Sequence, residues 1–195
     1  MRVGIFGGTF NPIHYGHLRI AECAVSELAL DKFYFLPTNV PPHKDSSQII
    51  DIKHRKKMVL LAIEGNHFFD ISDIESGTSG PSYTTDTIDK FAYEFTGAEL
   101  YFLTGADTLK VFHNYKNYKN IINKARLVVA PRPGSDFTSG VHDDVLKASI
   151  FLKKADLLDI SSTKIRDIIN SGGTVRYLLP EPVNEYILTN GLYCR

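Results

Sequence analysis

Short apolar runs alternate with stretches of helical periodicity along most of this sequence, and this alternation most constrains the fold. The runs cover residues 3–6, 33–36, 68–72, 100–103 and 127–130. Strands of a parallel sheet are buried on both faces, so they are continuously apolar rather than alternating apolar and polar. The helical stretches between them can serve as crossover connections. The pattern therefore predicts an α/β, Rossmann-like fold with a doubly wound parallel sheet.

Helical stretches alternate with the predicted strands up to about residue 160, and two helical stretches follow one another after it. Leu18, Ala21, Val25 and Leu28 recur at helical spacing. Further helices are expected at about 51–64, 88–95, 142–149, 162–171 and 181–190, with a short strand at 150–152. We therefore expect a single domain over 1–195, with an α/β core at about 1–160 and a small helical C-terminal piece at about 161–195.

Charge and cysteine content exclude several classes of protein. Lys plus Arg and Asp plus Glu both number 22, so no basic excess favours binding to long nucleic acid. Cys23 and Cys194 lie at opposite ends of the chain and indicate neither a disulfide framework nor a zinc site. No apolar stretch approaches the ~18 residues of a membrane span, and no targeting segment is evident. We expect a cytoplasmic protein without a nucleic-acid or membrane partner.

The segment GGTFNPIHYGH, residues 7–17, follows the first predicted strand. Gly7 and Gly8 remove side chains where the backbone turns toward a helix, so an anion can approach main-chain N–H groups at the positive helix end. His14 and His17 are three residues apart and can present two donors to the same anion. An ordinary turn with two unrelated histidines remains the alternative. The segment matches neither the dinucleotide fingerprint nor a P-loop.

The segment ISSTKIRD, residues 160–167, begins another predicted helix. Ser161, Ser162 and Thr163 are residue types that cap helices, and a hydroxyl-rich helix start is also typical of an anion site. Side chains lean back toward the helix N-terminus, so the Arg166 guanidinium can reach an anion held there. Simple capping without a ligand explains the hydroxyls equally well.

Together the two segments resemble the GxFxPxHxGH and ISSTxIR motifs of the nucleotidyltransferase α/β-phosphodiesterase superfamily. FLPTNVPPHK (35–44), GPSYTTDT (80–87) and TGADTL (104–109) extend the resemblance to the bacterial nicotinate-mononucleotide adenylyltransferase family over nearly the whole chain. The resemblance implies transfer of the adenylyl group of ATP to nicotinate mononucleotide, giving nicotinate adenine dinucleotide and pyrophosphate in NAD biosynthesis. Both substrates are the implied partners, Mg²⁺ is expected on the ATP phosphates with no protein metal ligand named, and a homo-oligomer is left open.

The same resemblance implies roles for individual residues. His14, His17 and Arg166 are expected to be catalytic. The expected ATP-binding residues are Gly8, Thr9, Phe10, His14, His17, Gly105, Asp107, Arg132, Ser161, Ser162, Thr163 and Arg166. Those expected to bind the acceptor nucleotide are Lys44, Tyr83, Thr84 and Tyr115. The sequence departs from the family at Tyr115 and Lys116, where relatives usually have Trp and Tyr.

Two other readings of the function stay open. The acceptor could be nicotinamide mononucleotide or phosphopantetheine, since the phosphate motifs do not specify the acceptor. A non-catalytic ATP-binding sensor is the third possibility. A phosphate monoester has its second pKa near ~6, so the nucleophile is already ionised and no general base is needed. This agrees with a sequence that offers donors and cations around phosphates rather than an acid–base pair.

Overall fold

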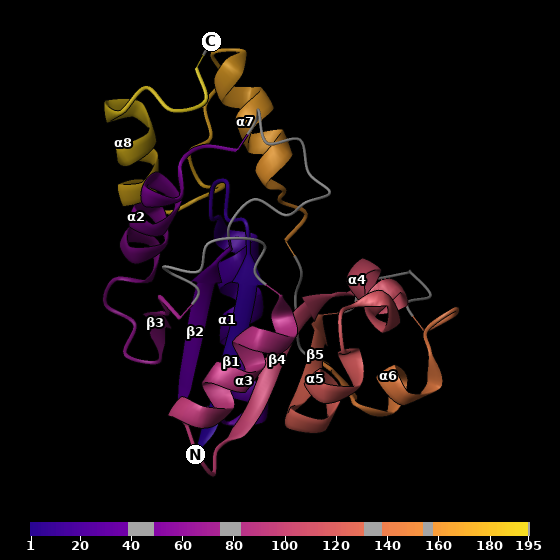
Figure 1. The fold of residues 1–195 in the computed structure, drawn as a ribbon. Coiled ribbons are helices and arrows are strands. Elements are labelled where there is room, and N and C mark those ends of the chain that lie inside the picture. The colour runs from indigo at the N-terminus through magenta and orange to yellow at the C-terminus, as the bar shows by residue number, and fades with distance from the viewer. Residues whose placement is uncertain (39–48, 75–82, 131–137, 154–157, 195) are drawn as a thin grey trace.

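The computed structural model describes residues 1–38, 49–74, 83–130, 138–153 and 158–194. The described strands form a six-stranded parallel sheet in the order β3-β2-β1-β4-β5-β6. They are β1 (Arg2–Gly8), β2 (Lys32–Pro37), β3 (Phe69–Ile71), β4 (Glu99–Gly105), β5 (Ala125–Ala130) and β6 (Ser149–Phe151). The predicted doubly wound parallel sheet is confirmed (Figure 1).

Helices cover both faces of the sheet. Their bounds are α1 (Tyr15–Leu28), α2 (Ile52–Ile63), α3 (Thr84–Glu94), α4 (Ala106–Val111), the 3-10 turn η2 (Phe112–Asn114), α5 (Tyr118–Lys124), α6 (Asp143–Lys147), α7 (Ser162–Asn170) and α8 (Glu181–Thr189). Buried residues of α1, α2, α7 and α8 pack with one set of strand residues. Those of α3, α4, α5 and α6 pack with the other set. The described residues therefore form two hydrophobic cores, one on each side of the sheet.

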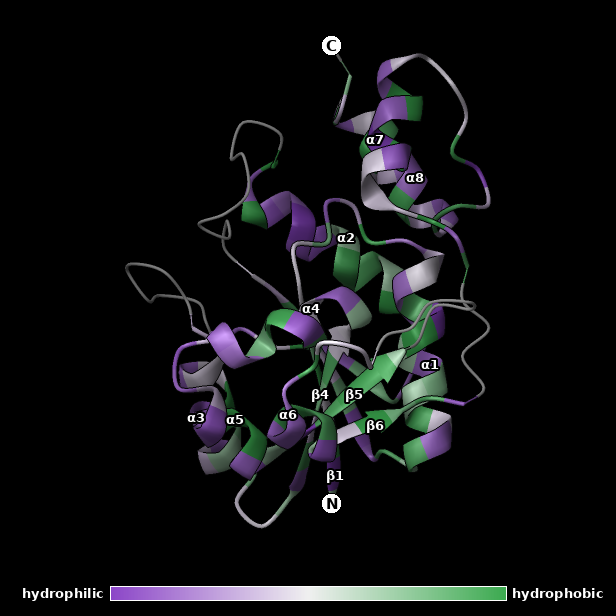
Figure 2. Cartoon of the chain, turned by 90° about the vertical axis from the view of Figure 1, so that its right-hand side faces the viewer, coloured by the Kyte–Doolittle hydropathy of each residue, from purple (hydrophilic) through white to green (hydrophobic). Residues whose placement is uncertain are grey.

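Consecutive strand residues contribute to opposite cores, as the two-residue repeat of a strand requires. In β5, Leu127 and Val129 belong to one core while Val128 and Ala130 belong to the other. Because both faces are covered, the central strands are mainly apolar, as the green colour of much of β4 and β5 in Figure 2 shows. This burial explains why the strands were predictable as continuous apolar runs.

The sequence did not predict the helices between β4 and β5. α4, η2 and α5 are six, three and seven residues long. Each of these elements buries a single residue, Leu109, Phe112 or Ile121, so none of them contains a periodic set of buried apolar residues. Segments this short obtain their stability from packing on the sheet rather than from their own sequence.

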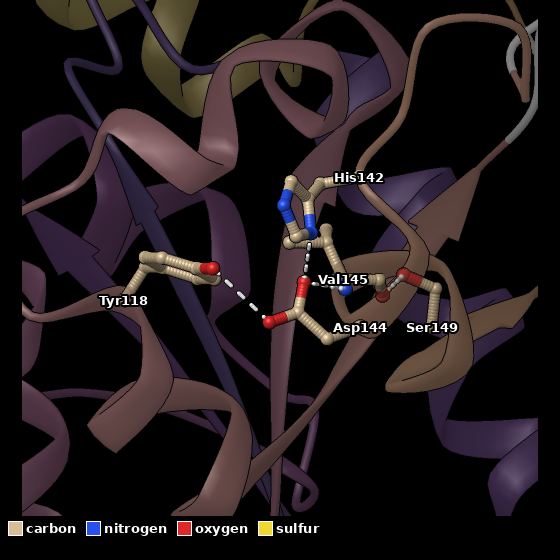
Figure 3. A network of polar contacts seen from close by, with 5 residues as sticks. All are labelled: Tyr118, His142, Asp144, Val145 and Ser149. Atoms are coloured by element: carbon tan, nitrogen blue, oxygen red, sulfur yellow. Dashed lines mark hydrogen bonds and ion pairs between the residues drawn. The ribbon is translucent and has the colours of Figure 1, made fainter.

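A polar network attaches α5 to α6 beside this part of the sheet (Figure 3). The Tyr118 hydroxyl donates to Asp144 Oδ2 at 3.0 Å, and the Val145 N–H donates to Asp144 Oδ1 at 2.8 Å. His142 Nδ1 also contacts Asp144 Oδ1. Ser149 Oγ donates to the Val145 carbonyl at 2.7 Å, which connects α6 to the start of β6. In the parts of the chain that the structure describes, no helix is both long and apolar enough to cross a membrane.

We predict that Gly4→Ala destabilises the fold. A Cβ atom on Gly4 would lie 2.3 Å from Phe33 Cδ2 and 2.8 Å from Leu30 Cδ1, and both of these side chains are buried. Overpacking of this kind lowers the free energy of unfolding by about 1–3 kcal/mol, which urea denaturation would measure. Gly7→Ala in the same strand is the control, because its nearest contacts would be at 3.8 Å. Equal stability of the two variants would contradict this account.

Candidate functional site

A cavity of about 1310 Å³ opens at the carboxyl ends of β1 and β4. The chain leaves these neighbouring strands toward opposite ends of the sheet, since β2 and β3 follow on one side and β5 and β6 on the other. Such a reversal of strand order creates the crevice in which doubly wound sheets bind ligands. The loop after β1, the start of α1, the end of β4, the start of α4 and the start of α7 all line this cavity.

The loop after β1 forms one wall. Gly7, Gly8, Thr9 and Phe10 line the cavity, and Phe10 has a left-handed backbone with φ of 47°. A Cβ atom on Gly8 would lie 2.8 Å from the Phe10 ring, so the tight approach of this ring requires glycine. The Thr38 N–H donates to the Gly8 carbonyl at 2.9 Å, which holds that peptide against the end of β2.

His14 and His17 stand together at the start of α1. His14 is the N-cap residue, and the two rings stack with centroids 3.7 Å apart. The His14 backbone N–H donates to His17 Nδ1 at 3.3 Å, so Nδ1 accepts and Nε2 carries the proton of the neutral His17 ring. Phe10 packs edge-on against His17 at 5.1 Å. The predicted proximity of the two histidines is therefore present, and their orientation is held by packing.

His14 is buried, with 5% of its surface exposed. Burial lowers the pKa of His14 to about 4, because the charged ring would lose its hydration. Its Nδ1 atom is buried and has no hydrogen-bond partner among the described residues. At neutral pH His14 is thus an uncharged ring with an unsatisfied polar atom in the cavity wall.

The start of α7 forms the opposite wall. Ser161 caps the helix by accepting from the Lys164 N–H at 3.2 Å, and Ser162 Oγ donates to the Pro12 carbonyl at 2.9 Å. Arg166 Nη1 donates to the Asn11 carbonyl at 3.0 Å. The guanidinium therefore leans back toward the helix N-terminus, as expected from the direction of helical side chains. These hydrogen bonds join the start of α7 to the loop after β1, two segments that are distant in the sequence.

The end of β4 supplies the floor of the site. Gly105 is the N-cap residue of α4 and lines the cavity together with Asp107. Asp107 is in the first turn of α4 rather than at the cap. A carboxylate there lies near the positive end of the helix and can accept hydrogen bonds from the hydroxyl groups of a ligand.

The cavity contains all the described residues expected to bind ATP, but none of those expected to bind the acceptor. Tyr83, Thr84 and Tyr115 lie outside its lining. Tyr83 is the N-cap residue of α3, and Lys116 Nζ lies 4.0 Å above its ring. Tyr115 stacks on Phe112 with centroids 4.7 Å apart. Lys44 and Arg132 lie outside the described residues.

The cavity also contains residues that sequence reasoning had not selected. Lys164 Nζ pairs with Asp159 Oδ2 at 3.2 Å at its edge. Ile20, Ile49 and Ile160 add an apolar surface. A hydroxyl-rich helix start could have indicated Lys164, whereas the isoleucines carry no signal beyond their apolar character. The described residues contain no group of three or more His, Cys, Asp or Glu placed to hold a metal ion.

Comparison with known proteins agrees with this geometry. The cytidylyltransferase-like family model matches residues 5–168, which include both walls of the cavity. The chain belongs to the cytidylyltransferase-like family. Two curated relatives that are similar over almost the whole chain are named "Probable nicotinate-nucleotide adenylyltransferase". One from Clostridium tetani is 43% identical, covering 97% of each chain. One from Dictyoglomus turgidum is 40% identical, covering 100% of this chain and 96% of the relative.

A solved structure has the same fold as this chain. The nicotinic acid mononucleotide adenylyltransferase of Plasmodium falciparum, complexed with NaAD, superposes with a TM-score of 0.80. The match covers 98% of this chain and 97% of that chain at 17% sequence identity. At this identity the likeness concerns the fold, which has the arrangement predicted from the apolar runs.

We predict that His14 makes the stability of the ligand-free protein pH-dependent. The unfolded chain holds a proton on this ring below pH ~6.5, whereas the folded protein holds it only below about 4. Unfolding therefore takes up a proton between these values, and the free energy of unfolding falls as the pH decreases through this window. The expected loss between pH 7 and pH 4.5 is on the order of 2–3 kcal/mol.

The measurement is urea denaturation of the wild type and His14→Gln at both pH values. The other titrating groups are shared by the two proteins, so the difference between their pH dependences isolates His14. Identical pH dependences would show that the ring titrates normally in the folded protein.

Proposed function

We propose that the chain transfers the adenylyl group of ATP to nicotinate mononucleotide, giving nicotinate adenine dinucleotide and pyrophosphate. One observation carries the proposal: two helix N-termini, each with its characteristic donors, face one cavity at the strand-order reversal. The positive ends of helices favour phosphate groups. The names of the full-length relatives support both the reaction and the acceptor.

In this proposal the two walls hold the triphosphate from opposite sides. The loop N–H groups and His14 and His17 bind the α- and β-phosphates, while Arg166 and Thr163 bind the β- and γ-phosphates. Since His14 is neutral, it acts as a hydrogen-bond donor rather than as a fixed charge. Its unpartnered Nδ1 then gains the partner that it lacks in the free protein. Ser161 and Ser162 act mainly by holding α7 and the loop in place.

The chemical step requires little from the protein beyond placement and charge stabilisation. A 5′-phosphate oxygen of the mononucleotide attacks the α-phosphorus of ATP, and the bond from that phosphorus to the pyrophosphate oxygen breaks. The attacking phosphate is already ionised at neutral pH, so no proton needs to be removed. His17 Nε2–H and Arg166 stabilise the charge that accumulates on the transferred and leaving groups.

ATP enters as its magnesium complex in this proposal. Mg²⁺ keeps most of its water ligands and binds substrate phosphates rather than a dedicated protein cage. In this proposal Asp107, in the first turn of α4 after the N-cap residue Gly105, accepts hydrogen bonds from the ribose hydroxyls of ATP.

The acceptor binds beside the ATP cavity in this proposal. Tyr83 is 41% exposed at the N-terminus of α3, and Tyr115 belongs to the neighbouring turn before α5. Asn120 Nδ2 donates to Thr85 Oγ1 at 3.0 Å, which fixes α5 against α3. Thr84 and the assigned Lys44 complete the acceptor site, the latter by family resemblance alone. The Lys116 ammonium, held over the Tyr83 ring, places a cation where it favours the nicotinate carboxylate.

The first test measures pyrophosphate release from magnesium ATP with three acceptors. We expect release with nicotinate mononucleotide and little with nicotinamide mononucleotide or phosphopantetheine. Release with another acceptor instead would keep the chemistry and refute the assigned acceptor. Binding of ATP without turnover on any acceptor would favour a nucleotide sensor.

We predict that His17→Ala lowers turnover about 10²-fold or more, because loss of one transition-state donor has an effect of this size. The substrate-binding affinities should change much less than turnover, since the donor acts on charge that develops during the reaction. His67→Ala is the matched control, because His67 is exposed on the other side of the fold and does not line the cavity. Near-wild-type turnover of His17→Ala would remove His17 from the catalytic residues.

A further inference from the structure

Arg55, in the first turns of α2, is the least exposed charged side chain among the described residues, with 1% of its surface accessible. It does not line the cavity. It also forms no ion pair with a carboxylate within the described ranges, although Asp51 lies near enough to act on it electrostatically. Burial lowers the pKa of Arg55, but a guanidinium remains charged at neutral pH. A buried cation without a paired anion is unfavourable unless other groups satisfy it.

Backbone carbonyls from three segments satisfy the guanidinium. Nη1 donates to the Thr9 carbonyl at 2.8 Å and to the Thr38 carbonyl at 2.7 Å, while Nε donates to the Ile50 carbonyl at 3.1 Å. Thr9 belongs to the loop after β1, Thr38 follows β2, and Ile50 precedes α2. One planar side chain therefore fastens the cavity loop to two neighbouring segments.

The contact with Thr9 determines how the loop faces the cavity. In a trans peptide the C=O and the following N–H point in opposite directions. Because the Thr9 carbonyl points at Arg55, the Phe10 N–H points away from it. The Gly8 carbonyl is likewise held by the Thr38 N–H, so the Thr9 N–H points away from β2. Both residues line the cavity, and their N–H groups are the donors that an anion needs.

The next residues of the loop are held from the C-terminal side. Tyr193 donates its hydroxyl to Asn11 Oδ1 at 2.9 Å, and Arg166 Nη1 donates to the Asn11 carbonyl. Asn11 is itself buried, with 4% of its surface exposed. The loop is thus clamped by α2 at Thr9 and by the C-terminal segments at Asn11, before any ligand binds.

We propose that Arg55 is a positioning residue: by holding the Thr9 carbonyl, it directs the loop N–H groups into the cavity and so fixes the anion-binding geometry. For its effect on turnover this inference rests on the proposed adenylyl transfer. Its effect on anion binding does not depend on the identity of the acceptor.

The test compares Arg55→Met, Arg55→Lys and Ile63→Ala with the wild type at a temperature where all are folded. Ile63 is buried in the same helix, about two turns beyond Arg55, so Ile63→Ala controls for a general loss of stability. Turnover and KM are measured for both substrates. ATP binding is measured separately by calorimetry, and the amide resonances of Thr9 and Phe10 report the loop directly by NMR.

We expect Arg55→Met to lower turnover about 10²-fold, because small displacements of positioning groups have effects of this size. It should also weaken ATP binding and shift the two amide resonances, whereas Ile63→Ala should alter stability alone. Arg55→Lys should recover part of the loss, since an ammonium keeps the charge but not the planar fork. If Arg55→Met does not fold, Arg55→Lys decides the question by the same measurements.

Two outcomes would overturn the inference. One is wild-type turnover and ATP affinity in the Arg55 variants. The other is an equal loss in Ile63→Ala, which would make the effect one of stability. A wild type that binds ATP but turns over no acceptor would refute the proposed function instead, and the calorimetry would then still decide the role of Arg55.

Discussion

The reversal of strand order between β1 and β4 is the constraint on which the rest of this structure depends. In a parallel sheet every strand ends at the same edge, so the loops at that edge normally crowd one another. Between β1 and β4 the connections leave in opposite directions, and the crevice stays open. The cavity, the helix start at His14 and the end of β4 at Gly105 all lie at this one point. The fold therefore sets the position of the site before any particular side chain is considered.

Sequence reasoning was successful where one physical signal dominates. Burial on both faces makes the strands continuously apolar, so they were predicted to within a few residues. The two segments selected for their glycines, hydroxyls and arginine both line the cavity, while their binding of an anion stays a prediction. The reasoning failed for α4 and α5, because six or seven residues carry too little periodicity. It also gave Arg55 no role, since a single arginine in an amphipathic helix is usually exposed. Only the fold reveals that three carbonyls surround it.

The polar groups around the cavity are arranged before a ligand arrives. The loop carbonyls at Thr9, Asn11 and Pro12 accept hydrogen bonds from Arg55, Arg166 and Ser162, respectively. Donors that are already oriented need little reorganisation when charge develops, and this is the main source of electrostatic stabilisation in enzymes. The neutral state of His14 follows from its burial, because a charged ring would lose its hydration. The hydrogen bonds from Arg55, Arg166 and Ser162 orient the loop without any ligand.

The two walls of the cavity are distant in sequence but share one hydrophobic core. Ile165 and Ile169 of α7 and Val183 and Ile187 of α8 pack in the same cluster as Phe10, Ile13 and the buried residues of α1. The separation of the walls is therefore set by side-chain packing, which resists small changes in distance. The position of α7 relative to the loop after β1 is then a consequence of how the C-terminal helices pack, although the hydrogen-bonded residues Pro12 and Ser162 lie 150 positions apart in the sequence.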